Sequence, residues 1–248
     1  MKDDSPSNKS KLWQSENSDR TKYIDEVFSK VHPYYNIMND CMSLGLHRIW
    51  KHEFIYLCSI KPTDQVLELA CGSGDISLLL ASRCDNKNTL TISDPNPAML
   101  EQTKRRLLDH GHIDFKSIQC YAESIPLPDA HLHHVCISFG IRNATDRTKA
   151  LYEIKRVLRP GGSLHILEFS HASWKLLNSI RSVWMKKCMM PLAEKFFHDR
   201  ESYEYLLESI ERHPSAPALS QELTSVGFTT VTHVALSGGL VALHHAKK

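Results

Sequence analysis

The sequence contains no C-x-x-C pair, although it has seven cysteines in 248 residues. They are Cys41, Cys58, Cys71, Cys84, Cys120, Cys136 and Cys188. An odd number of widely spaced cysteines does not fit a disulfide framework, and unpaired spacing argues against a structural zinc site. The pattern is typical of a chain in a reducing cytoplasm, and we expect no bound metal.

Long apolar runs and blocks of like charge are also missing. No stretch of 18 apolar residues occurs, so no membrane-spanning helix is expected. The formal net charge is +2, without the clustered basic face that nucleic-acid binding needs, so no nucleic-acid partner is expected. Residues 1–20 are polar and carry acidic residues, which fits neither a secretory nor a mitochondrial leader. We expect a disordered tail there and a cytoplasmic protein.

Residues 21–248 are predicted to form one domain, because the chain can bury a single core of ordinary size. Over residues 21–60, apolar side chains recur at helical spacing, with breaks at Pro33 and Gly45. A long helical insertion is expected at about 172–213. Two strands should then close the domain around the turn Ser237-Gly238-Gly239.

Between residue 65 and the insertion, short apolar runs alternate with helical stretches. This alternation predicts an α/β fold with a mostly parallel, Rossmann-like sheet of seven strands flanked by helices. Helices are expected to begin at Asp75, Pro97 and Arg147. The expected strands are Val66–Ala70, Leu90–Ser93, Ser117–Tyr121, His134–Ser138, Ser163–Phe169, Phe228–Ala235 and Leu240–His245.

The first strand leads into a glycine loop that contains Gly72, Ser73 and Gly74. Glycines there allow a ligand to approach the backbone closely. The third glycine of the dinucleotide fingerprint would fall at Ser77, so that fingerprint is incomplete. The carboxylates of Glu68 and Asp75 would repel a pyrophosphate but suit the sulfonium and amino group of S-adenosylmethionine. We therefore favour that cofactor over a nicotinamide dinucleotide.

Asp94 ends the second strand, about 20 residues after the glycine loop, where an acidic residue can accept hydrogen bonds from both ribose hydroxyls. The alternative is that Asp94 only caps the helix that follows, which would have Pro97 in its first turn.

Three further parts of the sequence resemble one family, the ubiquinone/menaquinone-biosynthesis C-methyltransferases, over roughly residues 21–246. They lie outside the features that all cofactor-binding folds share. They comprise Val27-Phe28 with Tyr35–Lys51 (YNIMNDCMSLGLHRIWK); Ile137–Asn143 (ISFGIRN) with Asp146, Leu158–Gly162 (LRPGG) and Leu167–Ser170 (LEFS); and Tyr203–Pro214 with Gly239–His244 (GLVALH).

The resemblance implies a class I methyltransferase fold and cofactor contacts at Ser73, Asp94, Tyr121-Ala122 and Ser138. This chain departs from the family in having Tyr121 where a small polar or acidic residue is usual. Two alternatives stay open there: the tyrosine ring stacks on the adenine, or only the backbone at Ala122 binds it. Asn36 and His133 also replace residues that are usually acidic.

The implied acceptor is a polyprenyl benzoquinol or demethylmenaquinol, methylated on a ring carbon. Ionisation of the neighbouring hydroxyl makes that carbon electron-rich. Arg142 is the candidate catalytic residue, because a permanently charged guanidinium can stabilise a phenolate. The alternative is a structural salt bridge with Asp146 or Glu168. Asn143 could orient the ring or satisfy backbone groups.

Residues 174–200 interleave apolar and basic side chains, which is typical of an amphipathic helix on an anionic membrane or of a lid over the site. Peripheral contact with the inner face of a bacterial cytoplasmic membrane is therefore one expectation. A homodimer and a quinone-synthesis assembly are both left open. The alternative to an enzyme is a non-catalytic cofactor-binding subunit.

Overall fold

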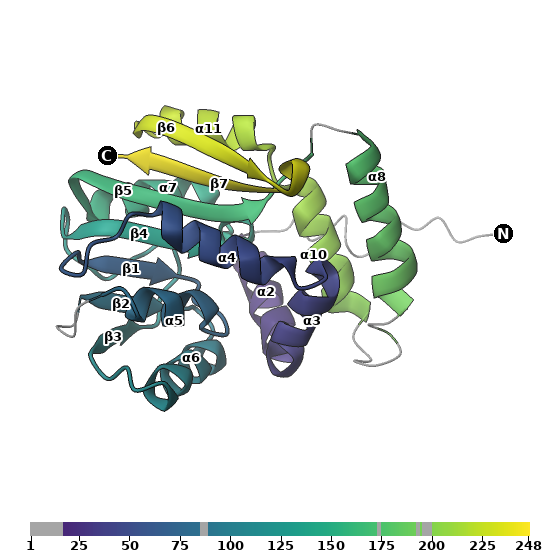
Figure 1. Cartoon of the computed structure of the whole chain (residues 1–248), viewed down its shortest axis with the longest axis horizontal. Coiled ribbons are helices and arrows are strands. Elements are labelled where there is room, and N and C mark those ends of the chain that lie inside the picture. The colour runs from purple at the N-terminus through teal and green to yellow at the C-terminus, as the bar shows by residue number, and fades with distance from the viewer. Residues whose placement is uncertain (1–16, 85–88, 173–174, 192–193, 195–199) are drawn as a thin grey trace.

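The computed structural model describes residues 17–84, 89–172, 175–191, 194 and 200–248 (Figure 1). The amino-terminal helices are α2 (Asn17–Val31), α3 (Tyr35–Ser43) and α4 (Leu46–Leu57). The central part comprises β1 (Val66–Leu69), α5 (Asp75–Ala81), β2 (Leu90–Ser93), α6 (Pro97–Asp109), β3 (Phe115–Ile118), β4 (Leu132–Ser138), α7 (Arg147–Val157) and β5 (Leu158–Phe169). The carboxyl-terminal part comprises α8 (Lys175–Val183), α10 (Arg200–Arg212), α11 (Ala216–Ser225), β6 (Thr229–Leu236) and β7 (Val241–Lys247).

The seven strands form one sheet in the order β3-β2-β1-β4-β5-β7-β6. Strands β1 to β5 pair in parallel, and β7 is antiparallel to both of its neighbours. This confirms the predicted mostly parallel, Rossmann-like sheet. The order reverses between β1 and β4, and in such sheets ligands bind beyond the carboxyl ends of the strands at that point.

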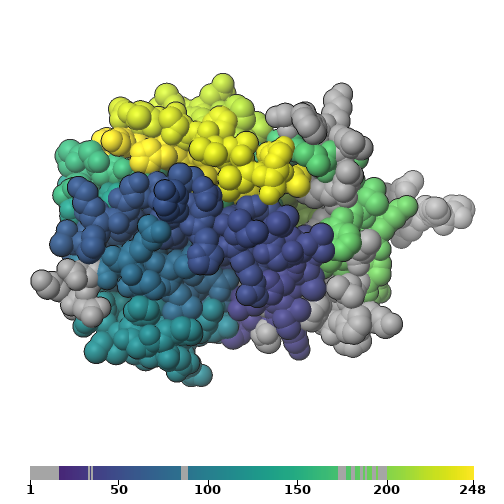
Figure 2. Space-filling model, in the orientation of Figure 1, coloured from purple at the N-terminus to yellow at the C-terminus, as the bar shows by residue number. Residues whose placement is uncertain are grey.

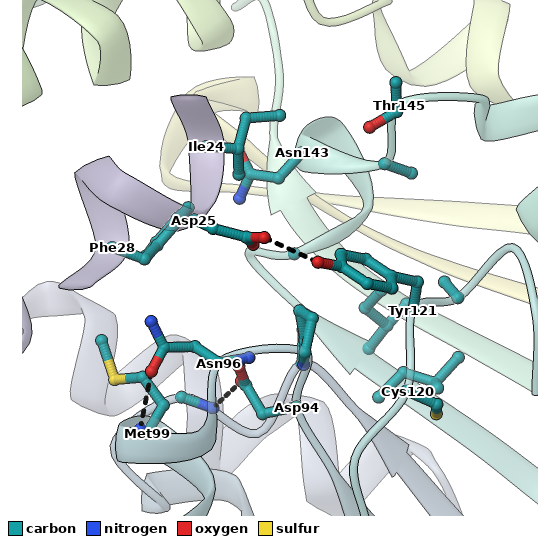
Figure 3. Close-up of a pocket in the computed structure, with 18 of the residues that line it drawn as sticks. Ile24, Asp25, Phe28, Asp94, Asn96, Met99, Cys120, Tyr121, Asn143 and Thr145 are labelled. Atoms are coloured by element: carbon teal, nitrogen blue, oxygen red, sulfur yellow. Dashed lines mark hydrogen bonds between the residues drawn. The ribbon is translucent and has the colours of Figure 1, made fainter. Parts of the chain in front are cut away.

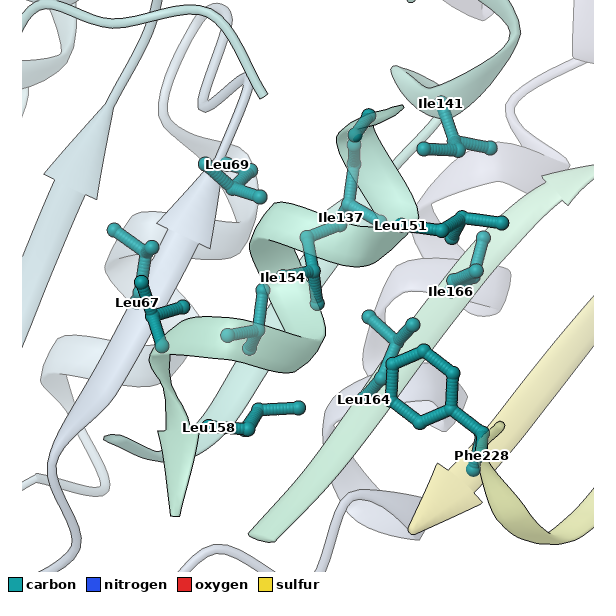
Figure 4. Close-up of a cluster of buried hydrophobic side chains, with 14 of the residues drawn as sticks. Leu67, Leu69, Ile137, Ile141, Leu151, Ile154, Leu158, Leu164, Ile166 and Phe228 are labelled. Carbon is teal, nitrogen blue, oxygen red and sulfur yellow. The ribbon is translucent and has the colours of Figure 1, made fainter. Parts of the chain in front are cut away.

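Alternate residues of the strands pack against helices on opposite faces of the sheet. Leu67 and Leu69 of β1 face α7 and α11, in a core that also contains Ile154 and Leu223 (Figure 4). Val66 faces the other side, where Phe54 of α4, Leu80 of α5 and Leu107 of α6 cover the sheet. Both faces are buried, which explains why the central strands read as continuous apolar runs.

A third group of helices, α2, α3, α8 and α10, lies together to one side of the sheet (Figure 1). Val31 of α2, Met38 of α3, and Tyr203 and Leu206 of α10 share a small apolar cluster. The two predicted helix breaks are present, since a 3₁₀ turn at His32–Tyr34 separates α2 from α3 and Gly45 precedes α4. None of the described helices is long and apolar enough to cross a bilayer.

Three elements have a boundary that differs from the predictions by more than two residues. Helix α2 begins at Asn17, so residues 17–20 are helical; the Thr21 hydroxyl donates to the Asn17 carbonyl in its first turn. Strand β3 is Phe115–Ile118 rather than Ser117–Tyr121, because it pairs with β2 from Phe115↔Leu90 to Ile118↔Ser93 and leaves Tyr121 in the following loop.

The third difference is at β5, which begins at Leu158, where a turn was expected, because Leu158 pairs with Leu132. Helix α11, between the insertion and β6, was not predicted. Its buried residues are few (Ala216, Leu219 and Leu223), so its apolar periodicity is short.

Candidate active site

A cavity of about 830 Å³, including its open mouth, lies beyond the carboxyl ends of β1, β2 and β4. Figure 3 shows that side chains of α2, among them Asp25 and Phe28, form one wall opposite the loops that follow the strands. A smaller cavity of about 300 Å³ adjoins it and shares Ala70, Gly72, Ser138 and Phe139 with it.

The glycine loop connects the two cavities. Gly72 lines both of them, and Ser73 lines the smaller one, where its hydroxyl donates a 2.6 Å hydrogen bond to Asn36 Oδ1. Gly74 lies outside both linings. It has a positive φ of 87°, and a Cβ added to it would come within 3.0 Å of Thr103 Oγ1. Gly74 therefore allows close packing of the loop against α6, whereas Gly72 faces the ligand space.

Asp94 lies in the wall of the larger cavity and binds two backbone amides. Its Oδ2 accepts from Gly72 N and its Oδ1 from Asn96 N, each at 2.9 Å. A carboxylate has about four acceptor sites, so two remain for ribose hydroxyls. Burial raises the pKa of Asp94 to about 6. The alternative that Asp94 caps α6 is wrong, because Asn96 is the N-cap and accepts from Ala98 N and Met99 N.

Tyr121 and Ala122 also line the larger cavity, as the resemblance implied. The Tyr121 hydroxyl donates a 2.6 Å hydrogen bond to Asp25 Oδ2 of α2 (Figure 3). Burial, together with this acceptor, raises the pKa of Tyr121 to about 12, so the phenol stays protonated. The hydroxyl is therefore engaged by α2, while the ring remains a wall of the cavity.

Ser138 ends β4 between the two cavities. Its hydroxyl is buried and has no hydrogen-bond partner among the residues that the structure describes. Since buried hydroxyls are almost always paired, this group fits a polar ligand placed between the cavities. The neighbouring Phe139 and, across the site, Ala70 both have positive φ, 54° and 53°. Such backbone strain in non-glycine residues tends to occur at ligand sites.

The two acidic residues beside the glycine loop do not present the free negative charge that we expected. Asp75 pairs with Lys51 Nζ at 2.9 Å and with Arg106 Nη1 at 2.8 Å. Burial raises its pKa, but these two cations outweigh burial and lower it to about 2. Glu68 is fully buried and accepts from Ser77 Oγ; burial raises its pKa to about 8, so it is largely neutral at pH 7. Our electrostatic reason for rejecting a pyrophosphate is therefore wrong.

Arg142 lies in the 3₁₀ turn Ile141–Asn143 after β4, and its side chain is only 3% exposed. Its Nη1 binds Glu168 Oε1 at 2.8 Å and the Phe139 carbonyl, and its guanidinium carbon lies 5.4 Å from the Phe169 ring centroid. Arg142 therefore forms the salt bridge with Glu168 that we considered as the alternative to a catalytic role. Asp146, the other partner considered, instead caps α7. Nε of Arg142 is buried without a partner among the described residues.

The sequence did not place several residues of the site beside the glycine loop. Ile24, Asp25 and Phe28 reach the cavity from α2, some 45 residues before the glycine loop. Asn143 lines the cavity and its Oδ1 accepts from the Tyr205 hydroxyl of α10 at 3.1 Å. No local spacing relates these positions to the glycine loop, so only the fold reveals that they meet.

A cysteine and a pair of histidines near the central strands could also carry chemistry. Cys71 is buried, and burial raises the pKa of its thiol well above the usual value, which makes it a poor nucleophile. His134 Nδ1 lies 3.0 Å from His165 Nε2, and no group of three or more potential ligands within the described ranges has a metal-binding arrangement.

A family model described as the ubiE/COQ5 methyltransferase family matches residues 15–248. Among curated relatives, the ubiquinone/menaquinone biosynthesis C-methyltransferase UbiE of Xanthomonas campestris pv. campestris is 41% identical over 231 residues, which cover 93% of this chain and 91% of the relative. The same-named protein of Francisella philomiragia is 38% identical and covers 91% of each chain.

Solved structures share the fold at low sequence identity. A SAM-dependent methyltransferase from Aquifex aeolicus superposes with a TM-score of 0.58 at 16% identity, covering 79% of this chain and 88% of that one. A SAM-dependent methyltransferase from Thermotoga maritima, titled a possible histamine N-methyltransferase, gives 0.60 at 16% identity and covers 90% and 99%. These likenesses confirm the predicted fold class.

Proposed function

Because the chain belongs to the ubiE/COQ5 methyltransferase family, we propose that it transfers a methyl group to a ring carbon of a polyprenyl benzoquinol or a demethylmenaquinol. The cofactor is S-adenosylmethionine, which supplies an electrophilic methyl group on a sulfonium. The observation that carries the proposal is the double cavity at the β1/β4 switch point, where Asp94, Gly72 and Ser138 present the polar groups that such a cofactor needs. Relatives bearing the C-methyltransferase name over nine-tenths of the chain support the acceptor class.

We assign the cofactor contacts to individual groups. The free acceptor sites of Asp94 bind the ribose hydroxyls. Tyr121 and Ala122 flank the adenine in the larger cavity, with the Tyr121 ring held in place by Asp25. Gly72, Ser73 and Ser138 contact the part of the cofactor that passes into the smaller cavity, and Gly74 keeps the loop close to α6. These groups bind and orient the cofactor. The increase in the rate of methyl transfer comes from alignment of the methyl group with the acceptor carbon.

We propose that Arg142 acts on the acceptor electrostatically while it stays paired with Glu168. The Nε–H group of Arg142 has no hydrogen-bond partner among the described residues. Arg142 precedes Asn143, which lines the cavity. A buried guanidinium stabilises a phenolate more strongly than an exposed one, because little water screens it. Burial raises the pKa of Tyr205 to about 12, so its hydroxyl remains a donor and fixes Asn143 beside the acceptor.

We also propose that the protein meets a membrane surface from the end formed by α2, α3 and α4. Ile37, Leu44 and Ile49, at the corner between α3 and α4, are 53%, 70% and 64% exposed. Figure 2 shows the surface of α3 and α4 uncovered on the face toward the viewer. Most side chains of the amphipathic segment 174–200 lie outside the described residues, although Val183 and Lys187 are exposed. Co-sedimentation with lipid vesicles would support this contact, and Ile49→Ser should weaken it.

The proposed reaction is tested with the purified protein, S-adenosylmethionine and reduced or oxidised forms of both precursor types. The hydroxyl of a quinol supplies electron density to the ring, whereas the carbonyls of a quinone withdraw it. We expect a mass gain of one methyl group with the quinol only, on a product that acid does not demethylate. Equal transfer to the quinone, or a methyl group on oxygen, contradicts the proposal. Cofactor binding without transfer to either acceptor would indicate the non-catalytic alternative.

A further inference from the structure

Helix α4 places a cation directly against the glycine loop. Lys51 is buried, with a side chain only 9% exposed, and its Nζ lies 2.9 Å from Asp75 Oδ2. Arg106 of α6 approaches the same carboxylate from the other side, with Nη1 2.8 Å from Asp75 Oδ1 and a further hydrogen bond to the Ser73 carbonyl. One carboxylate therefore lies between two cations.

Two cations, Lys51 and Arg106, face the one ionised carboxylate of Asp75 and neutralise it. The other acidic group that lines the smaller cavity, Glu68, carries little charge at pH 7 because burial raises its pKa to about 8. These two carboxylates therefore leave little negative charge against an anion beside Lys51.

Only one of the two cations faces that space. Lys51 lines the smaller cavity together with Ser73, Asp75 and Ser138, whereas Arg106 lines neither cavity. A lysine ammonium has three donors, and the ion pair with Asp75 accounts for one of them. Lys51 is therefore able to bind a second anion without releasing the first.

We infer that Lys51 binds the carboxylate of the methionine moiety of the cofactor in the smaller cavity. The inference rests on the proposed placement of the adenosine moiety in the larger cavity, beside Asp94 and Tyr121. The two cavities share four lining residues and therefore adjoin, and we place the amino-acid end of the same ligand in the smaller one, against Lys51. The site therefore binds cofactors that carry a carboxylate more tightly than shortened analogues that lack one.

The test compares two ligands that differ in this end. S-adenosylhomocysteine has the carboxylate, and 5′-methylthioadenosine lacks the whole aminocarboxylate. In calorimetric titration, Lys51→Met should weaken S-adenosylhomocysteine binding roughly ten- to a hundredfold, as expected for loss of a charge-assisted hydrogen bond. Binding of 5′-methylthioadenosine should change less than about twofold. Lys51→Arg, which keeps the charge, should recover part of the loss.

Arg106→Met is the matched control, because it removes the other cation of Asp75 without touching the cavity. Arg106→Met should change the affinities for S-adenosylhomocysteine and 5′-methylthioadenosine by the same factor. Equal weakening of both ligands by Lys51→Met would make Lys51 a structural partner of Asp75 and overturn the inference, as would unchanged affinity for S-adenosylhomocysteine. If Lys51→Met does not fold, the wild-type protein still decides: it should bind the carboxyl methyl ester of S-adenosylhomocysteine at least tenfold more weakly than the acid. A wild-type protein that binds none of these ligands would instead refute the cofactor site itself.

Discussion

The hydroxyl of Tyr121 donates a 2.6 Å hydrogen bond to Asp25 Oδ2 across the larger cavity, joining the loop after β3 to helix α2. The same helix is joined to two further loops that line the cavity, since Ser29 accepts from Asn96 Nδ2 and Thr21 shares a hydrogen bond with Thr145. Helix α2 is thus held over the cavity by polar contacts with three loops that follow strands.

Tyr121→Phe removes this hydrogen bond but keeps the ring, so bound cofactor product should dissociate about fivefold faster, as for loss of about 1 kcal/mol. Asp25→Ala, which removes the acceptor of this hydrogen bond, should behave similarly in stopped-flow measurements with S-adenosylhomocysteine. Tyr121→Leu, which also removes the ring, should weaken binding further if the ring stacks on the adenine. Equal effects of Phe and Leu would leave adenine binding to the backbone at Ala122.

The affinity for S-adenosylhomocysteine should depend on pH through Asp94. Its pKa is raised to about 6 by burial, and only the ionised carboxylate accepts from both ribose hydroxyls. Below pH 6 the group must lose a proton to bind, so affinity should fall by up to about tenfold per pH unit. Asp94→Asn should bind at least tenfold more weakly at pH 7 and lack this dependence between pH 5 and 7. A flat wild-type profile would argue against Asp94 as the ribose ligand.

Glu68 should make the wild-type protein less stable as pH rises. Burial raises its folded pKa to about 8, above the ordinary value of 4.5 expected for the unfolded chain. Between these values the native state holds more protons than the unfolded state, so stability falls with rising pH and levels off above pH 8. Glu68→Gln still accepts from Ser77 but does not titrate. In urea unfolding, it should gain roughly 3 kcal/mol relative to wild type between pH 5 and 8. A constant difference between the two proteins would contradict the neutral state of Glu68.

Arg142 can be tested for catalysis separately from its ion pair. Arg142→Ala leaves Glu168 buried and unpaired, and should lower the free energy of unfolding by about 3–5 kcal/mol. The double variant Arg142→Met, Glu168→Gln has no buried charge and should recover most of that loss. We expect the double variant to bind S-adenosylhomocysteine nearly as tightly as wild type but to lose most methyl transfer to the quinol. Transfer at the wild-type rate would assign Arg142 a structural role alone.

The predictions that are wrong concern the charges of side chains and the pairing of strands. Glu68 and Asp75 lie beside the glycine loop as predicted, but their charge depends on burial and on Lys51 and Arg106, which come from other helices. The third strand was placed two residues too late, because its register with β2 is a long-range property.

The amino-acid sequence alone predicts the alternation of strands and helices, the position of the glycine loop and the placement of Asp94 after the second strand. These features are local: apolar periodicity, glycine and the spacing along one βαβ unit fix them. Their order also placed Ser138 and Arg142 at the end of β4, on the same edge of the sheet.

Which side chains from distant parts of the sequence complete the site follows from the packing of the helices on the sheet. Asp25 of α2 and Lys51 of α4 are distant in sequence from the loops that they contact. No periodicity of the sequence links them to Tyr121 or Asp75. Packing of α2 over the strand ends brings Asp25 to the cavity, and packing of α4 on the sheet buries Lys51 beside the glycine loop. Protonation states follow from that packing as well, because desolvation and neighbouring charges shift a pKa only once the chain has folded.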